Sequence, residues 1–264
     1  MPKPSILFIP GSFAIPELYS NIFDAVTAKG YEIKGLHLPS VGLKTGPRKE
    51  PPATIYDDAA FIAKEVENLA DDGRDVMLIG HSYGGIPITQ CTQGLTKAER
   101  QKEGKKGGIV RLAYMTALVP APGQSGLKFL ETLPAEHSAE YGLDDKGYLY
   151  FDDVPKAALL TFSDVVDQTE RVALVEKFQV HSSVSFANEL THAGYKDVPV
   201  SYLFCEIDQC VLPRLQKDGI DTIEKESGNK VDVTYVNAGH CPTATATQET
   251  VDWIVQAAAK HEAV

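Results

Sequence analysis

The stretch Gly80-His81-Ser82-Tyr83-Gly84 decides the fold of this chain. An apolar run at residues 76–79, typical of a strand buried on both faces, precedes it, and a helix-like segment follows it. G-x-S-x-G between a strand and a helix is the pattern of a nucleophile elbow. The serine is held there in strained geometry with its hydroxyl exposed, and only glycine at the two ends lets the strand and the helix pass so closely. The pattern predicts that Ser82 is a catalytic nucleophile.

Strand-like and helix-like segments alternate on both sides of this corner. Strands are expected at residues 6–10, 31–38, 109–115, 198–205 and 230–236, and helices at residues 16–29, 54–70, 215–226 and 247–260. Successive βα units of this kind build a parallel sheet with right-handed crossovers. We therefore predict an α/β fold with a mostly parallel sheet flanked by helices.

The alternation stops at Pro120 and returns near residue 197. Between these points the chain mixes short helices, turns and aromatic clusters, and residues 147–152 read as one arm of a hairpin. An insertion after the carboxyl end of a strand lies over the sheet edge at which α/β folds bind ligands. We expect residues 1–120 and 197–264 to form the core and residues 121–196 to form a lid. An added stabilising subdomain is the alternative, and the two interpretations are compatible.

A nucleophilic serine needs a base and an acid that orients the base. In this topology both should follow late strands, in the chain order serine, acid, histidine. His240 fits the base, since it follows the strand at residues 230–236 in a loop shaped by glycine and proline. Asp208 and Glu206 compete for the acid. Asp208 lies further beyond its strand, where a carboxylate can reach the histidine loop, so we favour Asp208 and keep Glu206 as the alternative.

The tetrahedral intermediate of acyl transfer also needs hydrogen-bond donors for its oxyanion. One is the backbone N–H of Tyr83, which follows the nucleophile at the start of a helix. The second should come from the loop after the first strand, Pro10-Gly11-Ser12-Phe13. We choose Ser12, and Phe13 stays open as the alternative.

Composition narrows the partners and the cofactors. The chain has 264 residues, with 25 Lys and Arg against 36 Asp and Glu, and this net charge of −11 argues against nucleic acid or an anionic membrane as partner. The start of the chain shows no signal-peptide core, so we expect a cytoplasmic protein. The four cysteines lack C-x-x-C spacing, which argues against zinc, and we expect no metal and no cofactor. Whether Cys210 and Cys241 are free or bonded stays open.

These motifs together resemble the α/β-hydrolase superfamily, and within it the small-esterase group of plant methylesterases and hydroxynitrile lyases. Gly80-His81-Ser82-Tyr83-Gly84-Gly85 is similar to that group's nucleophile motif, Cys205-Glu206-Ile207-Asp208 to its acid-bearing turn and Ala238-Gly239-His240 to its histidine loop. Pro10 departs from the group's oxyanion-loop histidine. Gly11 stands where lyase members carry threonine, and Cys241 where they carry lysine, and both differences tell against cyanohydrin cleavage.

The sequence predicts a serine hydrolase that cleaves a small, hydrophobic carboxylic ester or lactone through an acyl-enzyme at Ser82. Its partner would be that small molecule, and a homodimer stays open. Two alternatives remain. One is a C–C bond lyase of the hydroxynitrile-lyase type that uses the same three side chains, and the other is a non-catalytic small-molecule receptor on the same fold.

Overall fold

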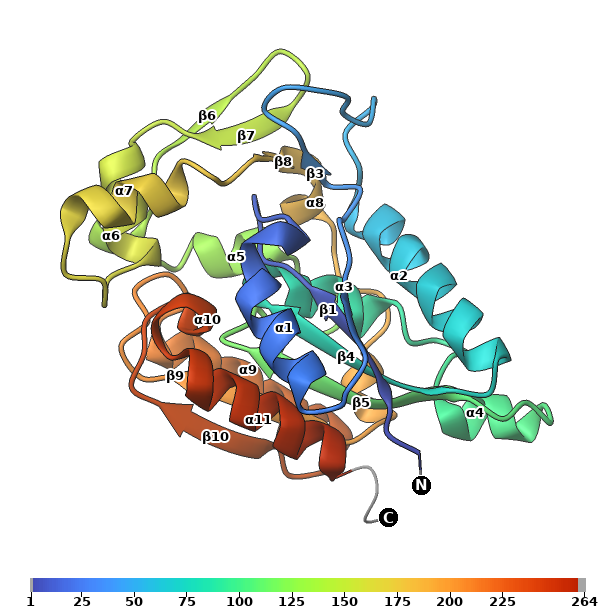
Figure 1. Ribbon diagram of the computed structural model, residues 1–264. Coiled ribbons are helices and arrows are strands. Elements are labelled where there is room, and N and C mark those ends of the chain that lie inside the picture. Colours follow the sequence, from blue (N-terminus) through green and yellow to red (C-terminus); the bar gives the residue numbers. More distant parts are fainter. Residues whose placement is uncertain (1, 261–264) are drawn as a thin grey trace.

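A six-stranded, all-parallel sheet forms the centre of the protein and runs in the order β10-β9-β5-β4-β1-β2 (Figure 1). The computed structural model describes residues 2–260. The strands of this sheet are β1 (Ser5–Ile9), β2 (Ile33–Gly35), β4 (Asp75–His81), β5 (Gly108–Met115), β9 (Val200–Cys205) and β10 (Asp232–Val236). The predicted parallel α/β sheet is confirmed. The strand expected at residues 31–38 is shorter than predicted, because only residues 33–35 pair with β1.

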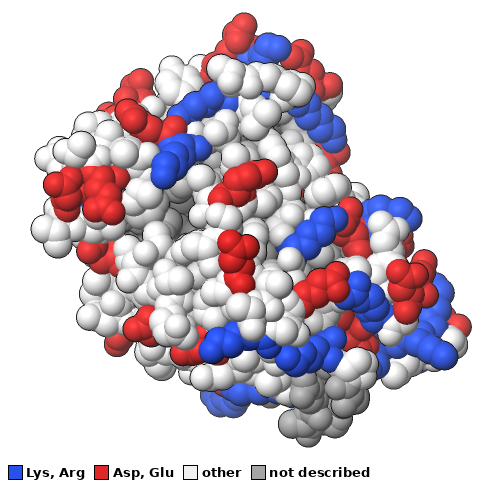
Figure 2. Space-filling model, in the orientation of Figure 1, with Lys and Arg blue, Asp and Glu red and all other residues white. Residues whose placement is uncertain are grey.

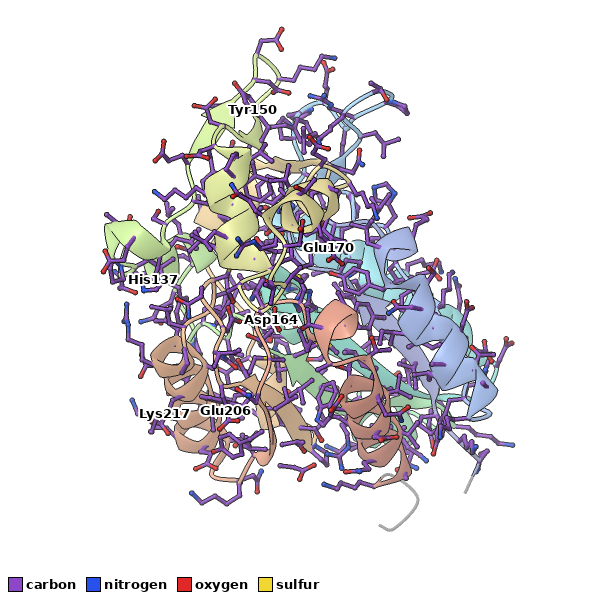
Figure 3. All side chains as sticks on the ribbon, turned by 60° about the vertical axis from the view of Figure 1, so that its left-hand side comes forward. His137, Tyr150, Asp164, Glu170, Glu206 and Lys217 are labelled. Atoms are coloured by element: carbon purple, nitrogen blue, oxygen red, sulfur yellow. The ribbon has the colours of Figure 1, made fainter. Side chains whose placement is uncertain are left out.

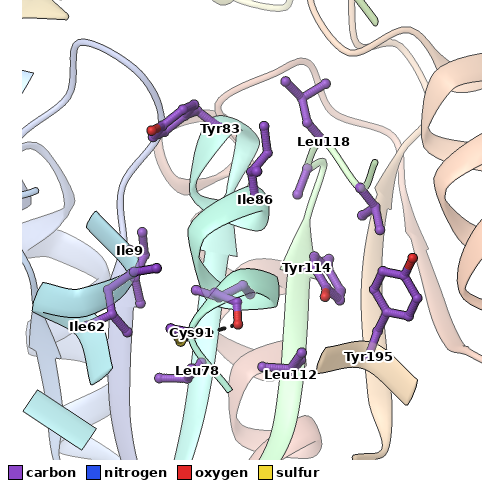
Figure 4. Packing of buried hydrophobic residues seen from close by; sticks show 14 of the residues in the cluster. Ile9, Ile62, Leu78, Tyr83, Ile86, Cys91, Leu112, Tyr114, Leu118 and Tyr195 are labelled. Carbon is purple, nitrogen blue, oxygen red and sulfur yellow. Dashed lines mark hydrogen bonds between the residues drawn. The ribbon is translucent and has the colours of Figure 1, made fainter. Parts of the chain in front are cut away.

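Helices cover both faces of the sheet because alternate strand residues are buried on opposite sides. In β4, Val76 and Leu78 belong to one apolar cluster, whereas Met77 and Ile79 belong to the other. Figure 4 shows part of the first cluster, in which strand residues such as Leu78 pack near Ile62. The helices on the first face are α2 (Ile55–Asp71), α3 (Gly85–Gln90) and α9 (Pro213–Ser227), and those on the second are α1 (Ser20–Ala28) and α11 (Thr247–Ala259).

Local sequence explains where the longest helix begins. Thr54 accepts a hydrogen bond from the Asp57 backbone N–H, and the Asp57 carboxylate accepts from the Thr54 backbone N–H, so α2 starts with a capping box. The same device, built from Thr96 and Glu99, starts α4 (Lys97–Lys102). None of the helices in residues 2–260 is long and apolar enough to cross a membrane.

A second, antiparallel sheet lies over the upper part of the molecule in Figure 1. Its order is β3 (Val41–Gly42), β8 (Val180–Ser182), β7 (Tyr148–Phe151) and β6 (Tyr141–Leu143). The hairpin arm expected at residues 147–152 is present as β7, which pairs with β6. β3 was not predicted, because a two-residue strand inside a Pro- and Gly-rich loop has no periodicity. Its pairing with β8 ties the early loop to residues 121–196, which we call the inserted segment.

Short helices complete the described chain. In the inserted segment they are α5 (Gly126–Leu130), η3 (Ala135–His137), α6 (Val154–Thr161), α7 (Gln168–Val175), α8 (Ser183–Ala187) and η4 (Gly194–Lys196). Elsewhere they are η1 (Pro16–Tyr19), η2 (Ser82–Gly84) and α10 (Pro242–Thr245). The inserted segment thus contributes the hairpin and α6 and α7 on the upper left of Figure 1, above the carboxyl ends of the parallel strands.

Candidate active site

Ser82 occupies the sharp corner between β4 and α3. Its backbone φ is 53°, in the left-handed region that a serine rarely adopts. A Cβ atom on Gly80 would lie 2.6 Å from the carbonyl oxygen of Gly84, and one on Gly84 would lie 2.5 Å from that of Ile9. Only glycine fits at these two positions, because the atoms that would clash are backbone atoms. The corner therefore has the tight geometry that the sequence predicted.

The structure brings the predicted serine, histidine and aspartate together. His240 Nε2 lies 3.0 Å from Ser82 Oγ, and His240 Nδ1 lies 2.8 Å from Asp208 Oδ2. All three side chains are buried, and Asp208 is fully so, at 0% exposure. They follow the carboxyl ends of β4, β9 and β10, which are brought to one edge because the sheet is parallel. The hydroxyl, the imidazole and the carboxylate thus form a continuous hydrogen-bonded chain.

Asp208 is held in place by further donors. Its Oδ1 accepts from the backbone N–H of Cys210 at 2.7 Å and of Val211 at 3.0 Å, and its Oδ2 accepts from the hydroxyl of Thr116. Together with His240, these donors satisfy the hydrogen-bonding capacity of a fully buried carboxyl group. Glu206, the alternative acid, is exposed at the surface (Figure 3). The geometry supports Asp208.

His81 links Tyr19 to the loop that carries His240 through two hydrogen bonds. Its Nδ1 accepts from the Tyr19 hydroxyl at 2.8 Å, and its Nε2 donates to the backbone carbonyl of His240 at 2.8 Å. Tyr19 in turn accepts from the backbone N–H of Gly11 at 3.3 Å. Burial lowers the pKa of His81 to about 3, which keeps the ring neutral as these two hydrogen bonds require. The first loop, the elbow and the histidine loop are thereby tied together.

One buried histidine, His181, contacts both loops from which the oxyanion donors are expected, the loop with Ser12 and Phe13 and the turn with Tyr83. His181 Nδ1 accepts from the backbone N–H of Phe13 at 3.3 Å, and its ring packs edge-on against Tyr83 with centroids 4.6 Å apart. Burial lowers the pKa of His181 to about 3, so the imidazole is a neutral acceptor. The Phe13 N–H is thus already used, whereas within the described chain the Ser12 N–H donates no hydrogen bond. Ser12 lines the cavity beside Ser82.

The side chain of Tyr83 is held by a hydrogen bond to the buried Asp58. Its hydroxyl donates to Asp58 Oδ2 at 2.8 Å, and the same carboxylate accepts from the hydroxyl of Ser40 at 2.6 Å and from its backbone N–H at 2.9 Å. Burial raises the pKa of Asp58 to about 6, despite these three hydrogen bonds. This network fixes the residue whose backbone N–H follows the nucleophile.

A cavity of about 360 Å³ opens over Ser82 and His240. Among the described residues that line it, none is Lys, Arg, Asp or Glu. This contrasts with the outer face in Figure 2, where charged side chains of both signs are interspersed. The leucine and phenylalanine side chains that the inserted segment contributes to the lining are Leu127, Phe129, Leu130, Leu133, Leu149, Phe151, Leu160, Phe178 and Phe186.

The thiols near the site are free. Cys210 and Cys241 both line the cavity, and neither is in a disulfide. Burial raises the pKa of both thiols well above the ordinary range, so both are protonated in the metal-free protein. In the described part of the chain, one group of side chains has metal-ligating atoms close together, and it consists of Asp208, Cys210 and His240.

Sequence reasoning missed the residues that support these groups. Thr116, Tyr19, Asp58 and His181 all contact the site or its loops, yet each is remote in sequence from its partner. Only the position of Thr116 could have been inferred from the sequence. It directly follows the carboxyl end of β5, at the same edge of the sheet as the other site residues. Tyr19 and Asp58 lie in segments that carry no motif, and nothing in the sequence around His181 pointed to its contact with Phe13.

The chain belongs to the alpha/beta hydrolase family, whose model matches residues 6–253. A relative from Phoma sp. (strain ATCC 20986 / MF5453), named "Probable hydrolase R7", is 33% identical over 262 residues, which cover 98% of this chain and 99% of that protein. The "Alpha/beta hydrolase nvfD" of Aspergillus novofumigatus is 28% identical over 248 residues, covering 92% and 91%. The family expected from the motifs is confirmed.

Solved structures share the fold over almost the whole chain. A pyrethroid hydrolase from Sphingobium faniae superposes with a TM-score of 0.72 at 20% identity, covering 97% of each chain. Polyneuridine aldehyde esterase superposes with a TM-score of 0.72 at 17% identity, covering 97% of this chain and 99% of the other. Tomato methylketone synthase I gives a TM-score of 0.71 at 13% identity, with 99% and 100% covered. At these identities the likeness concerns the fold.

Proposed function

We propose that this protein is a serine hydrolase that cleaves an uncharged, hydrophobic carboxylic ester or lactone. The observation that carries the proposal is the hydrogen-bonded chain from Ser82 through His240 to Asp208, at 3.0 and 2.8 Å, with Ser82 and His240 lining the cavity. A serine, a base and an acid at these distances form the constellation that activates a hydroxyl for acyl transfer. The relatives named as hydrolases support the same reading.

In this proposal Ser82 Oγ attacks the substrate carbonyl while His240 Nε2 takes its proton. Asp208 holds the imidazole through Nδ1 and stabilises the imidazolium that forms. The backbone N–H groups of Tyr83 and Ser12 donate to the oxyanion, and each such donor contributes about 2.7–4 kcal/mol to lowering the barrier. His240 then protonates the leaving alcohol. Water activated by His240 releases the acid from the acyl-enzyme, and no cofactor takes part.

The uncharged cavity defines the substrate class within this proposal. A charged substituent would lose its hydration without meeting an opposite charge, which costs several kcal/mol per ion. A neutral ester bears no such cost, whereas the carboxylate that hydrolysis produces does, and this favours product release. The aromatic and aliphatic side chains of the inserted segment would close over the substrate as a lid.

Turnover of neutral aryl esters and lactones tests the proposal. We expect the protein to hydrolyse members of such a panel and the Ser82→Ala variant to lose this activity. Tight binding of these compounds without turnover would instead favour a receptor. Consumption of a substrate without water incorporation into an acid product would favour C–C cleavage.

A further inference from the structure

A third ligating side chain lies beside the histidine–aspartate pair. Atoms of Asp208, Cys210 and His240 that can bind a metal all lie within 4.8 Å of one another. A carboxylate oxygen, a thiolate sulfur and an imidazole nitrogen are the three ligand types that Zn²⁺ takes from proteins. We propose that these side chains form a binding site for a borderline-soft divalent cation such as Zn²⁺, and that the bound ion inhibits the enzyme.

The spacing of the imidazole nitrogen and the carboxylate oxygen is close to that of two ligands in a tetrahedral site, and the Cys210 sulfur lies within 4.8 Å of the ligand atoms of the other two residues. His240 Nδ1 lies 2.8 Å from Asp208 Oδ2. A tetrahedral Zn²⁺ with bonds of about 2.0–2.2 Å to nitrogen and oxygen would hold these two atoms about 3.3 Å apart. The pair therefore has to open by only about half an ångström to admit the ion. Asp208 Oδ1 would keep its two backbone N–H donors meanwhile, so the carboxylate stays anchored.

The charges also balance. Zn²⁺ replaces the proton of the Cys210 thiol, which is released to solvent, while the proton of His240 Nδ1 moves to Nε2, so the imidazole stays neutral. The thiolate and the Asp208 carboxylate then carry two negative charges against the two positive charges of the ion. A neutral site matters here because Asp208 and His240 are buried at 0% and 7% exposure. Cys210 is only partly buried and lines the cavity, which gives the ion a route.

The bound ion would stop acyl transfer for a geometric reason. It replaces the hydrogen bond that orients the imidazole toward Ser82 by a bond to the metal, and it prevents His240 from becoming an imidazolium stabilised by Asp208. This inhibition rests on the proposed function. The binding of zinc does not, because it depends only on the three ligands.

The structure offers a matched pair of variants for the test. Cys241 lines the same cavity as Cys210 but lies outside the group of three ligands. Equilibrium dialysis of the wild-type chain, Cys210→Ser and Cys241→Ser against ZnCl₂ measures binding directly. We expect one equivalent of zinc in the wild type and in Cys241→Ser, and an affinity at least about tenfold lower in Cys210→Ser. Mg²⁺ should not compete, because it prefers oxygen ligands alone.

Absence of zinc binding in the wild type, equal binding in Cys210→Ser, or an equal loss in both variants would overturn the proposed site. The rate of ester hydrolysis is the second measurement. For each variant, the rate with zinc is compared with the rate of the same variant without zinc. The zinc concentration for half-inhibition should rise at least about tenfold in Cys210→Ser alone. Zinc binding without any ester hydrolysis would refute the hydrolase proposal and support the zinc site. Ester hydrolysis without zinc binding would refute the zinc site and support the hydrolase proposal.

Discussion

His181 accepts a hydrogen bond from the backbone N–H of Phe13 across 168 positions of sequence. The same ring packs edge-on against Tyr83, so one side chain of the inserted segment contacts both loops that carry the proposed oxyanion donors. His181 is fully buried, which fixes the ring between them. The inserted segment therefore not only lines the cavity but also makes a hydrogen bond to the loop that holds Ser12.

His181→Phe and His181→Asn separate this role from simple packing. Phe keeps a ring but leaves the Phe13 N–H without an acceptor, whereas Asn offers its Oδ1 near the position of Nδ1. We expect kcat for a neutral aryl ester to fall by up to about 10²-fold in His181→Phe with little change in KM, because a misplaced donor weakens transition-state stabilisation. His181→Asn should recover part of the loss. A wild-type kcat in a folded His181→Phe variant would contradict the positioning role.

Asp208→Asn tests the orientation of the base. An amide cannot hold the tautomer of His240 that leaves Nε2 free to accept the serine proton, so kcat should fall by about 10⁴-fold. Glu206→Gln is the matched control, since it makes the same chemical change at the exposed acid two positions earlier. Steady-state kinetics with one aryl ester measures both variants. A large loss in Glu206→Gln together with a mild one in Asp208→Asn would show that the acid has been misassigned.

The buried Asp58 predicts a distinctive pH dependence of stability. Burial raises its pKa from 3.8 to about 6 in the folded chain. The folded state therefore holds this proton more tightly than the unfolded state, so the contribution to stability is full below pH 3.8 and is lost as the pH rises through about 6. A shift of this size corresponds to about 3 kcal/mol.

Urea unfolding between pH 4 and pH 7 measures this contribution. The free energy of unfolding of the wild type should decrease with rising pH relative to that of Asp58→Asn, which cannot titrate at this position. Parallel pH profiles for the two proteins would show that the carboxyl of Asp58 keeps an ordinary pKa. The comparison of slopes is used because the substitution itself also changes the hydrogen bonds to Ser40 and Tyr83.

Charge on the substrate should control turnover. Para-nitrophenyl hexanoate and the para-nitrophenyl monoester of adipic acid have acyl chains of equal length, but the second ends in a carboxylate. No charged side chain occurs among the described residues that line the cavity. We expect kcat/KM to be at least about 100-fold lower for the acid, because burying an unpaired ion costs several kcal/mol. Comparable values for the two esters would mean that the acyl chain stays in solvent.

Much of the fold and the core of the site could be predicted because their signals are local. The G-x-S-x-G corner, the apolar strand before it and the position of His240 after a late strand were all readable along the chain, and the parallel sheet then required their convergence. The residues that hold the catalytic side chains in place could not be predicted from the sequence. The contact of Thr116 with Asp208 joins residues 92 positions apart, and β3 is too short to show any period. The choice between Ser12 and Phe13 likewise depended on a histidine from the inserted segment.

Covalent labelling of Ser82 tests the central claim most directly. A fluorophosphonate reacts with a serine hydroxyl that has been activated by a base, and the donors of the oxyanion hole stabilise the adduct. Intact-mass measurement should show one adduct on the wild-type chain, mapped to Ser82 by peptide analysis, and none on Ser82→Ala. Equal labelling of the two proteins, or no labelling of a folded wild-type chain, would contradict the assignment of Ser82 as the nucleophile.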